Sequence, residues 1–183
     1  DPEIFRIEQD GVLARTWQFA VHSSQLENAG DYIAFEMAGE SLFCIKGRDG
    51  IIRTFYNVCQ HRAHQLVSGT GTTRVVVCPY HAWTYELTGG LRAGPNINVV
   101  EGFDKSKICL TEVRTEIFLG FVFVNLDNDA KQMDDWFPNV RVELTQWVPH
   151  FETLKPLEWV EVPENCNWKV SIENYSECYH CSL

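Results

Sequence analysis

The chain has 183 residues, with 15 Lys and Arg against 25 Asp and Glu, and a formal net charge of −10 at pH 7. Its 45% hydrophobic and 22% charged residues are typical of a globular protein and exclude a disordered one. The acidic balance argues against nucleic acid and anionic membranes as partners, since both select clustered Lys and Arg. No apolar run reaches the roughly 20 residues of a membrane helix. The opening residues 1–3 do not resemble a signal peptide, so we expect a cytoplasmic protein.

The first segment, residues 1–16, alternates apolar and charged side chains and predicts a short amphipathic helix interrupted near Gly11. Residues 17–126 have a different texture, with short β-branched and aromatic runs between Gly-containing turns such as 68–71. The predicted strands are 32–37, 41–46, 51–58, 74–78, 108–113 and 118–125. Short strands without intervening helices predict a mainly β, antiparallel domain.

The last segment, residues 127–183, again has a different pattern. Its predicted elements are a helix at 134–147, a strand at 157–162 and a helix at 167–181. Pro138 must fall in the first turn of its helix or break it. We interpret this segment as the start of a second, α+β domain that is truncated here and to which residues 1–16 also belong.

The chain has seven cysteines, and an odd count without an export signal argues against a disulfide scaffold. Free cysteine is one of the residue types most often buried. We therefore expect Cys44, Cys109 and Cys166 to be buried apolar residues. The other four lie close to histidines in the sequence: Cys59, Cys78, Cys178 and Cys181.

Two short motifs in the β domain combine thiol and imidazole side chains. Cys59-Gln60-His61 and Cys78-Pro79-Tyr80-His81 each follow a predicted strand. A tetrahedral zinc is the simplest interpretation of two sulfur and two nitrogen ligands, but zinc modules usually pair cysteine with cysteine. Mixed motifs favour a two-iron cluster in which each loop gives its Cys to one iron and its His to the other. Neutral imidazoles in place of two thiolates raise the cluster's potential from about −400 mV towards −150 to +300 mV.

These motifs resemble the Rieske [2Fe–2S] family, whose pattern is Cys-x-His, a spacer of this size, then Cys-x-x-His. His64 and Tyr80 stand where respiratory Rieske proteins have disulfide-forming cysteines, so the chain is similar to the ferredoxin and oxygenase branch. The resemblance gives no ligand role to His64, which we expect to be a surface or hydrogen-bonding residue. The cluster ligands that it implies are Cys59, His61, Cys78 and His81.

A second motif lies near the end of the chain. On a helix, Glu177 and His180 would share one face. Histidine and carboxylate side chains that converge on one point are the ligands of non-haem Fe(II) sites. The alternative is a surface Glu and a hydrogen-bonded His on an amphipathic helix. Residues 167–181 resemble the opening of the catalytic domain in Rieske non-haem iron oxygenase α-subunits. The resemblance implies that His180 is the first ligand of a mononuclear Fe(II).

In the same family a carboxylate at the position of Glu177 links this histidine to a cluster histidine of the neighbouring subunit, matched here by His81. The second His and the carboxylate ligand of the iron would follow beyond Leu183, so we expect the 183-residue chain alone to be inactive. The family resemblance also suggests a homotrimer.

The resemblance implies a terminal oxygenase component. An NAD(P)H-dependent flavin/iron–sulfur reductase delivers electrons through the [2Fe–2S] cluster to the mononuclear Fe(II). That iron activates O₂ to hydroxylate or N-demethylate a small organic substrate. Ring-hydroxylating enzymes usually have Asp at the position of Glu177. A Glu there is similar to the branch of the family that acts on quaternary ammonium compounds such as glycine betaine, carnitine or stachydrine. An aromatic ring is the other substrate class. The alternatives of another class are a stand-alone Rieske ferredoxin-type electron carrier and a structural zinc module.

Quaternary ammonium substrates favour an aromatic cage with cation–π contacts. Four tryptophans lie in the last segment, Trp168 in the predicted helix at 167–181 and three before that helix, but the substrate pocket of the family lies beyond residue 183. We therefore interpret Trp136, Trp147 and Trp159 as core aromatics.

Overall fold

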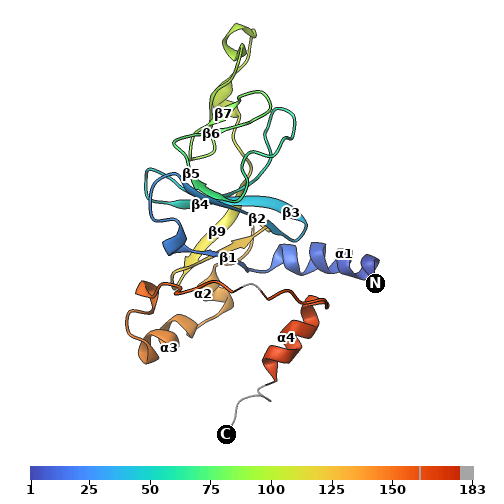
Figure 1. Cartoon of the computed structure of the whole chain (residues 1–183), viewed down its shortest axis with the longest axis vertical. Coiled ribbons are helices and arrows are strands. Elements are labelled where there is room, and N and C mark those ends of the chain that lie inside the picture. The colour runs from blue at the N-terminus through green and yellow to red at the C-terminus, as the bar shows by residue number, and fades with distance from the viewer. Residues whose placement is uncertain (161, 178–183) are drawn as a thin grey trace.

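Two antiparallel sheets form the body of the molecule (Figure 1). The computed structural model describes residues 1–160 and 162–177. Its strands are β1 (Gln18–His22), β2 (Asp31–Met37), β3 (Glu40–Lys46), β4 (Ile52–Tyr56), β5 (Thr70–Thr72), β6 (Val76–Val77), β7 (Thr84–Tyr85), β8 (Leu91–Ala93), β9 (Glu112–Phe118) and β10 (Phe121–Asn125). The larger sheet has the order β1-β10-β9-β4-β3-β2-β5 and the smaller one β6-β7-β8. The mainly antiparallel β fold predicted from the sequence is confirmed.

Two strand predictions were wrong in detail. The strands predicted at 108–113 and 118–125 are replaced by the hairpin of β9 and β10, which turns at Leu119 and Gly120 with positive φ angles of 53° and 87°. Such left-handed pairs match the twist of the flanking strands. The turn predicted at 68–71 contains part of the edge strand β5 instead. A Cβ on Gly71 would lie 2.8 Å from the Tyr32 hydroxyl oxygen, so glycine is needed there for a close approach across the sheet.

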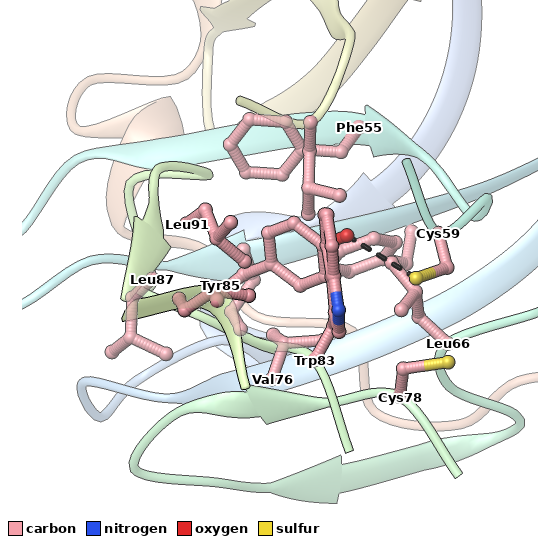
Figure 2. Close-up of a cluster of buried hydrophobic side chains, with 13 residues drawn as sticks. Phe55, Cys59, Leu66, Val76, Cys78, Trp83, Tyr85, Leu87 and Leu91 are labelled. Atoms are coloured by element: carbon pink, nitrogen blue, oxygen red, sulfur yellow. Dashed lines mark hydrogen bonds between the residues drawn. The ribbon is translucent and has the colours of Figure 1, made fainter. Parts of the chain in front are cut away.

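The main hydrophobic core lies between β3, β4 and the small sheet (Figure 2). Its largest fully buried side chains are Phe43, Phe55 and Tyr85. Burying each such side chain contributes roughly 1.5–3 kcal/mol. The core also includes both cysteines of the paired motifs: its buried members are Phe43, Ile45, Phe55, Cys59, Leu66, Val76, Cys78, Trp83, Tyr85, Leu87, Leu91, Ile97 and Leu110. The candidate site is therefore built on the core rather than attached to a surface loop.

The α-helices lie at the two ends of the described chain. They are α1 (Pro2–Gly11), α2 (Met133–Trp136), α3 (Val140–Trp147) and α4 (Trp168–Ser176). The 3₁₀ turns are Leu13–Arg15, Ser23–Gln25, Ile97–Val99, Lys105–Lys107 and Phe151–Thr153. Asp1 caps α1 by accepting from Glu3 N–H at 2.8 Å, and Asn167 caps α4 by accepting from Lys169 N–H at 3.1 Å. No helix in the described part of the chain is long and apolar enough to cross a membrane.

The segment after β10 differs from its prediction in three places. The helix predicted at 134–147 is divided into α2 and α3 because Pro138 has no N–H and disfavours a helical residue before it. The strand predicted at 157–162 was wrong, since residues 157–160 and 162 form no strand. The helix predicted at 167–181 ends at Ser176, and the part of it from 178 onward lies outside the described residues.

The N-terminal helix contacts the last helix. Glu8 of α1 accepts a hydrogen bond from the Trp168 indole N–H at 3.1 Å and forms an ion pair with Lys169. Both partners lie in the first turn of α4. The contact joins the two ends of the described chain, while the domain boundaries after residues 16 and 126 remain a prediction.

Several residues expected in the core lie at the surface. Trp136, Trp147 and Trp159 are 44%, 85% and 53% exposed, so their interpretation as core aromatics was wrong. They lie in a segment that buries few side chains against the sheet; Trp159 stacks on Phe19 of the edge strand β1 with ring centroids 6.0 Å apart. Cys44 is buried as predicted, but Cys109 and Cys166 are exposed because they precede β9 and α4 in irregular connections.

Gly30 provides a test of the sheet's packing. Its φ is +93°, and a Cβ there would lie 1.9 Å from the Thr73 carbonyl oxygen. We expect Gly30→Ala to lower the free energy of unfolding by about 3 kcal/mol, measured by urea denaturation. Gly50→Ala is the matched control, because Gly50 has a φ of +79° but no neighbour within 4 Å, and it should lose only about 1 kcal/mol. Equal losses would show that backbone strain alone, without the clash, governs both positions.

Candidate functional site

The first motif forms a loop between β4 and β5 that closes on its own backbone. Ala63 N–H donates to Cys59 O, and Cys59 N–H donates to His64 O, both at 2.9 Å. Ala63 has a φ of +51°, which turns the chain back on itself. The thiol of Cys59 therefore points from the start of a tight, self-bonded loop.

The second motif, between β6 and β7, repeats this construction. Ala82 N–H donates to Cys78 O at 3.0 Å, Cys78 N–H donates to Trp83 O at 2.8 Å, and Ala82 has a φ of +56°. In both loops the cysteine bonds the residues four and five positions later. The two loops are thus quasi-equivalent in backbone geometry, although the histidine follows its cysteine by two positions in one loop and by three in the other.

The four side chains of the paired motifs are arranged by depth. Cys59 and Cys78 are each 2% exposed, and Figure 2 shows both sulfur atoms on the same side of the core cluster. His61 is exposed and His81 half-buried, with ring centroids 4.8 Å apart. Two inner thiols and two outer imidazoles fit a [2Fe–2S] cluster that has one iron on each ligand type. No three His, Cys, Asp or Glu side chains within residues 1–160 and 162–177 surround a single-ion position.

Aromatic rings buttress both imidazoles. The Trp83 indole stacks on His61 with centroids 4.7 Å apart and 9° between planes, and Tyr80 lies against His81 at 3.7 Å. Phe103 packs edge-on against Trp83. Desolvation, and next the positive charge around His61, lower the pKa of His81, which favours the neutral imidazole that metals bind.

An open hollow of about 560 Å³ adjoins these rings. Besides His61, His81 and their aromatic neighbours, it is lined by residues from the loop after β8, including Ile97, Val100 and Phe103. Val100 is exposed and apolar. The imidazoles therefore lie within an apolar surface, which is suited to contact with another protein surface.

The Tyr85 side chain connects the core to the first loop. Its hydroxyl oxygen accepts a hydrogen bond from Gln60 N–H at 3.0 Å and lies 3.2 Å from Cys59 Sγ (Figure 2). Because the Gln60 N–H already donates to this oxygen, the hydroxyl hydrogen is free to donate to the sulfur. Burial, and next the Cys59 hydrogen bond, raise the pKa of Tyr85, so the phenol keeps its proton.

Asn57 anchors the base of the same loop. Its side-chain oxygen accepts from Leu66 N–H at 3.1 Å and Val67 N–H at 3.0 Å, and its amide nitrogen donates to Val67 O at 2.8 Å. Asn57 is buried, so these bonds satisfy polar groups that would otherwise be lost to the interior. It fixes the loop from below while Tyr85 fixes it from the side.

The other predicted site residues have three different outcomes. His64 is exposed and its Nδ1 hydrogen-bonds Gln65 O at 2.6 Å, which confirms a surface, hydrogen-bonding histidine. Glu177 was predicted to lie within the last helix, but α4 ends at Ser176. Glu177 has an extended backbone and an exposed side chain, and its N–H donates to Glu173 O. His180, Cys178 and Cys181 lie outside the described residues.

Comparison with known proteins identifies the family. Residues 16–104 match the Rieske [2Fe-2S] domain, and residues 151–183 match the ring hydroxylating alpha subunit (catalytic domain). The chain belongs to the Rieske non-haem iron oxygenases. The order of the two matches, with the catalytic match after the Rieske domain, is that of an oxygenase α-subunit rather than of a stand-alone ferredoxin or a zinc module. Two cofactors follow from this family, a Rieske [2Fe–2S] cluster and a mononuclear iron.

Relatives of this Rieske oxygenase cover nearly all of the chain. It is 42% identical over 182 residues to the carnitine monooxygenase oxygenase subunit of Escherichia coli (strain K12), covering 99% of the chain and 49% of that protein. It is 32% identical over 184 residues to the glycine betaine monooxygenase oxygenase subunit of Chromohalobacter salexigens, covering 100% and 40%. The quaternary ammonium Rieske monooxygenase CntA in complex with L-carnitine matches with a TM-score of 0.90 and 39% identity, covering 98% and 51%.

These relatives include oxygenase subunits named for carnitine and glycine betaine, the branch that the sequence motifs resemble. The chain spans about half the length of the curated relatives it matches. Tyr85, Asn57 and Trp83 are the site residues that sequence reasoning missed. Trp83 and Tyr85 follow the second motif directly, and their aromatic character was the available signal, but their partners lie in the first loop.

Tyr85 gives a test of this geometry in the Rieske oxygenase. A hydroxyl that donates to Cys59 Sγ stabilises the more negative, reduced state of a cluster bound there. We expect Tyr85→Phe to lower the midpoint potential by on the order of 50 mV, the equivalent of one hydrogen bond of about 1 kcal/mol. The measurement is a redox titration followed by visible absorbance. Tyr80→Phe is the control, since the exposed Tyr80 has no hydrogen bond to either sulfur in the described structure, and its potential should stay at the wild-type value.

Proposed function

We propose that the chain is the Rieske-bearing N-terminal part of a terminal oxygenase subunit that acts on a quaternary ammonium compound. The observation that carries this proposal is the likeness to oxygenase subunits for carnitine and glycine betaine along the whole chain. An aromatic ring is the second substrate class, and the substitution of Glu177 for the usual Asp favours the first.

The cluster ligands in this proposal are Cys59 and Cys78 on the inner side and His61 and His81 on the outer side. The burial of both thiols, the neighbouring imidazoles and the quasi-equivalent loops support this set. When bound, the cluster supplies a one-electron store with a higher potential than an all-cysteine cluster. The protein's own contribution is to exclude water from the sulfurs, donate a hydrogen bond from Tyr85 and hold the outer imidazoles at the surface.

The proposed iron ligand His180 and the proposed bridging carboxylate Glu177 belong to the other end of the molecule. Figure 1 shows α4, which precedes Glu177, at the end opposite β6 and β7, between which the His81 loop lies. A carboxylate that accepts from the N–H groups of two imidazoles must therefore meet His81 of another subunit. This supports an oligomer in which one subunit's cluster serves its neighbour's iron, and we propose a homotrimer.

The remaining partners follow from the same function. We propose an NAD(P)H-dependent flavin/iron–sulfur reductase as electron donor, and O₂ and a small organic molecule as substrates. We also propose a cytoplasmic protein, and the acidic charge of the chain argues against a nucleic acid or an anionic membrane as partner.

The function is tested with the complete polypeptide, its reductase and a panel of substrates. We expect three irons per subunit and oxidation of carnitine or glycine betaine, with simple aromatics as the comparison. Two irons per subunit would support the electron carrier instead, and turnover of aromatics alone would overturn the substrate class. Turnover by the 183-residue chain alone would contradict the proposed site, which needs further ligands.

A ligand substitution tests the outer pair. His81→Cys adds a negative charge next to the irons and should lower the midpoint potential by on the order of 100 mV in protein that still assembles a cluster. His64→Cys is the matched control, because His64 is exposed on the first loop and we propose no ligand role for it. If the two variants have the same potential, His81 is not a ligand.

Glu177→Gln tests the bridge between subunits. The amide offers one acceptor oxygen where the carboxylate accepts from two imidazoles, so product formation should fall at least about tenfold while the cluster spectrum is unchanged. The measurement is single-turnover oxidation of the pre-reduced cluster with substrate and O₂ present. Glu173→Gln, the same change one helical turn earlier on exposed α4, should behave as wild type. Wild-type rates in Glu177→Gln would make Glu177 an ordinary solvated residue.

A further inference from the structure

A group of basic side chains lies on one surface of the cluster-bearing domain. The Arg48 guanidinium donates to Arg74 O at 2.6 Å and lies 3.5 Å from the Glu86 carboxylate. Arg92 approaches the same carboxylate at 3.5 Å, and Lys105 Nζ donates to Arg92 O at 3.1 Å. These contacts connect the β3–β4, β5–β6 and β7–β8 connections, strand β8 and the 3₁₀ turn Lys105–Lys107. We call the three basic residues Arg48, Arg92 and Lys105, with Glu86 between them, the basic face.

The charge of the basic face is opposite to that of the chain. It contains three of the 15 Lys and Arg but only one of the 25 Asp and Glu, in a chain with a net charge of −10. The ion pairs beside it, Asp49–Arg53 and Asp104–Lys107, are each neutral. The basic face is therefore a local positive surface on an acidic protein, and such a surface steers a negatively charged partner to one place.

The guanidinium groups are available to a partner. Arg48 and Arg92 are 57% and 53% exposed, and their 3.5 Å approaches to Glu86 are longer than a direct hydrogen-bonded ion pair. Exposed pairs of this kind contribute little to stability. The Arg92 guanidinium can therefore turn to the carboxylates of another protein, and Arg48 can offer them the N–H groups that its bond to Arg74 O leaves over.

The Tyr85 side chain connects the turn that carries Glu86 of the basic face to Cys59. Glu86 directly follows Tyr85, and its N–H donates to Gly90 O at 2.8 Å in the turn that leads to Arg92. The buried Tyr85 side chain extends from this turn to within 3.2 Å of Cys59 Sγ. Figure 2 shows Leu87 and Leu91, which flank the turn, on the side of Tyr85 away from both cysteines. The turn therefore lies across Tyr85 from both cysteines, and Arg92 and Lys105 flank the loop that contributes Ile97, Val100 and Phe103 to the hollow beside His81.

We propose that the basic face is the docking surface for the electron-donor protein, which presents an acidic face to it. This inference rests on the proposed function. In each encounter one electron leaves the reduced donor and one is gained by the oxidised cluster of the chain, and no covalent bond forms or breaks. The three cations counter the repulsion that an acidic donor meets elsewhere on the surface.

Charge reversal in the complete polypeptide tests the proposal. The probe is the reductase of the source organism, purified by its ability to reduce the wild-type protein with NAD(P)H. We expect Arg48→Glu with Arg92→Glu to weaken reductase binding at least about tenfold at low salt, with a shallower dependence on ionic strength. Binding is measured by surface plasmon resonance, and reduction of the cluster by stopped-flow absorbance.

The matched control is Arg6→Glu with Lys131→Glu, which changes the net charge equally at exposed positions on α1 and just before α2. It should bind the reductase as wild type does. Equal weakening of both double variants would mean that total charge, not the basic face, governs binding, and would overturn the proposal. So would wild-type binding by the Arg48 and Arg92 variant.

Two further measurements distinguish failure of the docking proposal from misfolding of the variant and from failure of the proposed function. If charge reversal disturbs the absorbance spectrum or the unfolding midpoint, Arg48→Gln with Arg92→Gln replaces it, and wild-type binding by this neutral pair overturns the proposal. Single turnover after chemical reduction bypasses the donor. Normal donor binding at the basic face together with no oxidation of quaternary ammonium compounds would contradict the proposed substrate, while the docking surface would stand.

Discussion

The hydrogen bond between the Tyr85 hydroxyl and Cys59 Sγ is the contact on which the arrangement of the site depends. Tyr85 is fully buried among the core residues, yet its hydroxyl reaches both the thiol and the backbone of the first loop. Because the same side chain belongs to the core and to the site, the loops cannot move without disturbing the packing of β3, β4 and the small sheet. The two candidate cysteine ligands are thereby as well fixed as the hydrophobic core to which they belong.

The cysteines and the histidines of the site lie at different depths and have different surroundings. Buried sulfur atoms have few water molecules near them, whereas the imidazoles lie at an apolar surface where a second protein can approach. Both loops use the same backbone turn to bury the cysteine and expose the histidine. They differ in that His61 follows its cysteine by two positions and His81 by three. A similar separation exists over the whole molecule, since α4 and the paired loops lie at opposite ends (Figure 1). The proposed path between the two metal sites therefore crosses from one subunit to another.

The sequence was informative where chemistry is local and less so where it depends on tertiary contacts. The spacing of Cys59, His61, Cys78 and His81 indicated the paired loops because each motif closes within six residues. By contrast, the role of Tyr85 depends on a contact 26 positions away in the chain. The helical pattern around Glu177 could not locate the helix end at Ser176, since helix ends are set by capping and by neighbouring segments. The exposure of Trp136, Trp147 and Trp159 was predicted wrongly because nothing in the local sequence distinguishes an exposed aromatic residue from a buried one.

The two alanines that turn the loops have a consequence for the speed of electron transfer. Ala63 and Ala82 adopt positive φ angles that an L-residue reaches only at a cost of roughly 1–2 kcal/mol each. Glycine would remove this cost but would also give each loop more conformational freedom. The strained alanines therefore hold the loops in one shape whatever the charge of the centre they surround. A cluster bound in such a frame would meet the same loop shape in both of its charge states, so the loops would add little to the reorganisation energy of electron transfer.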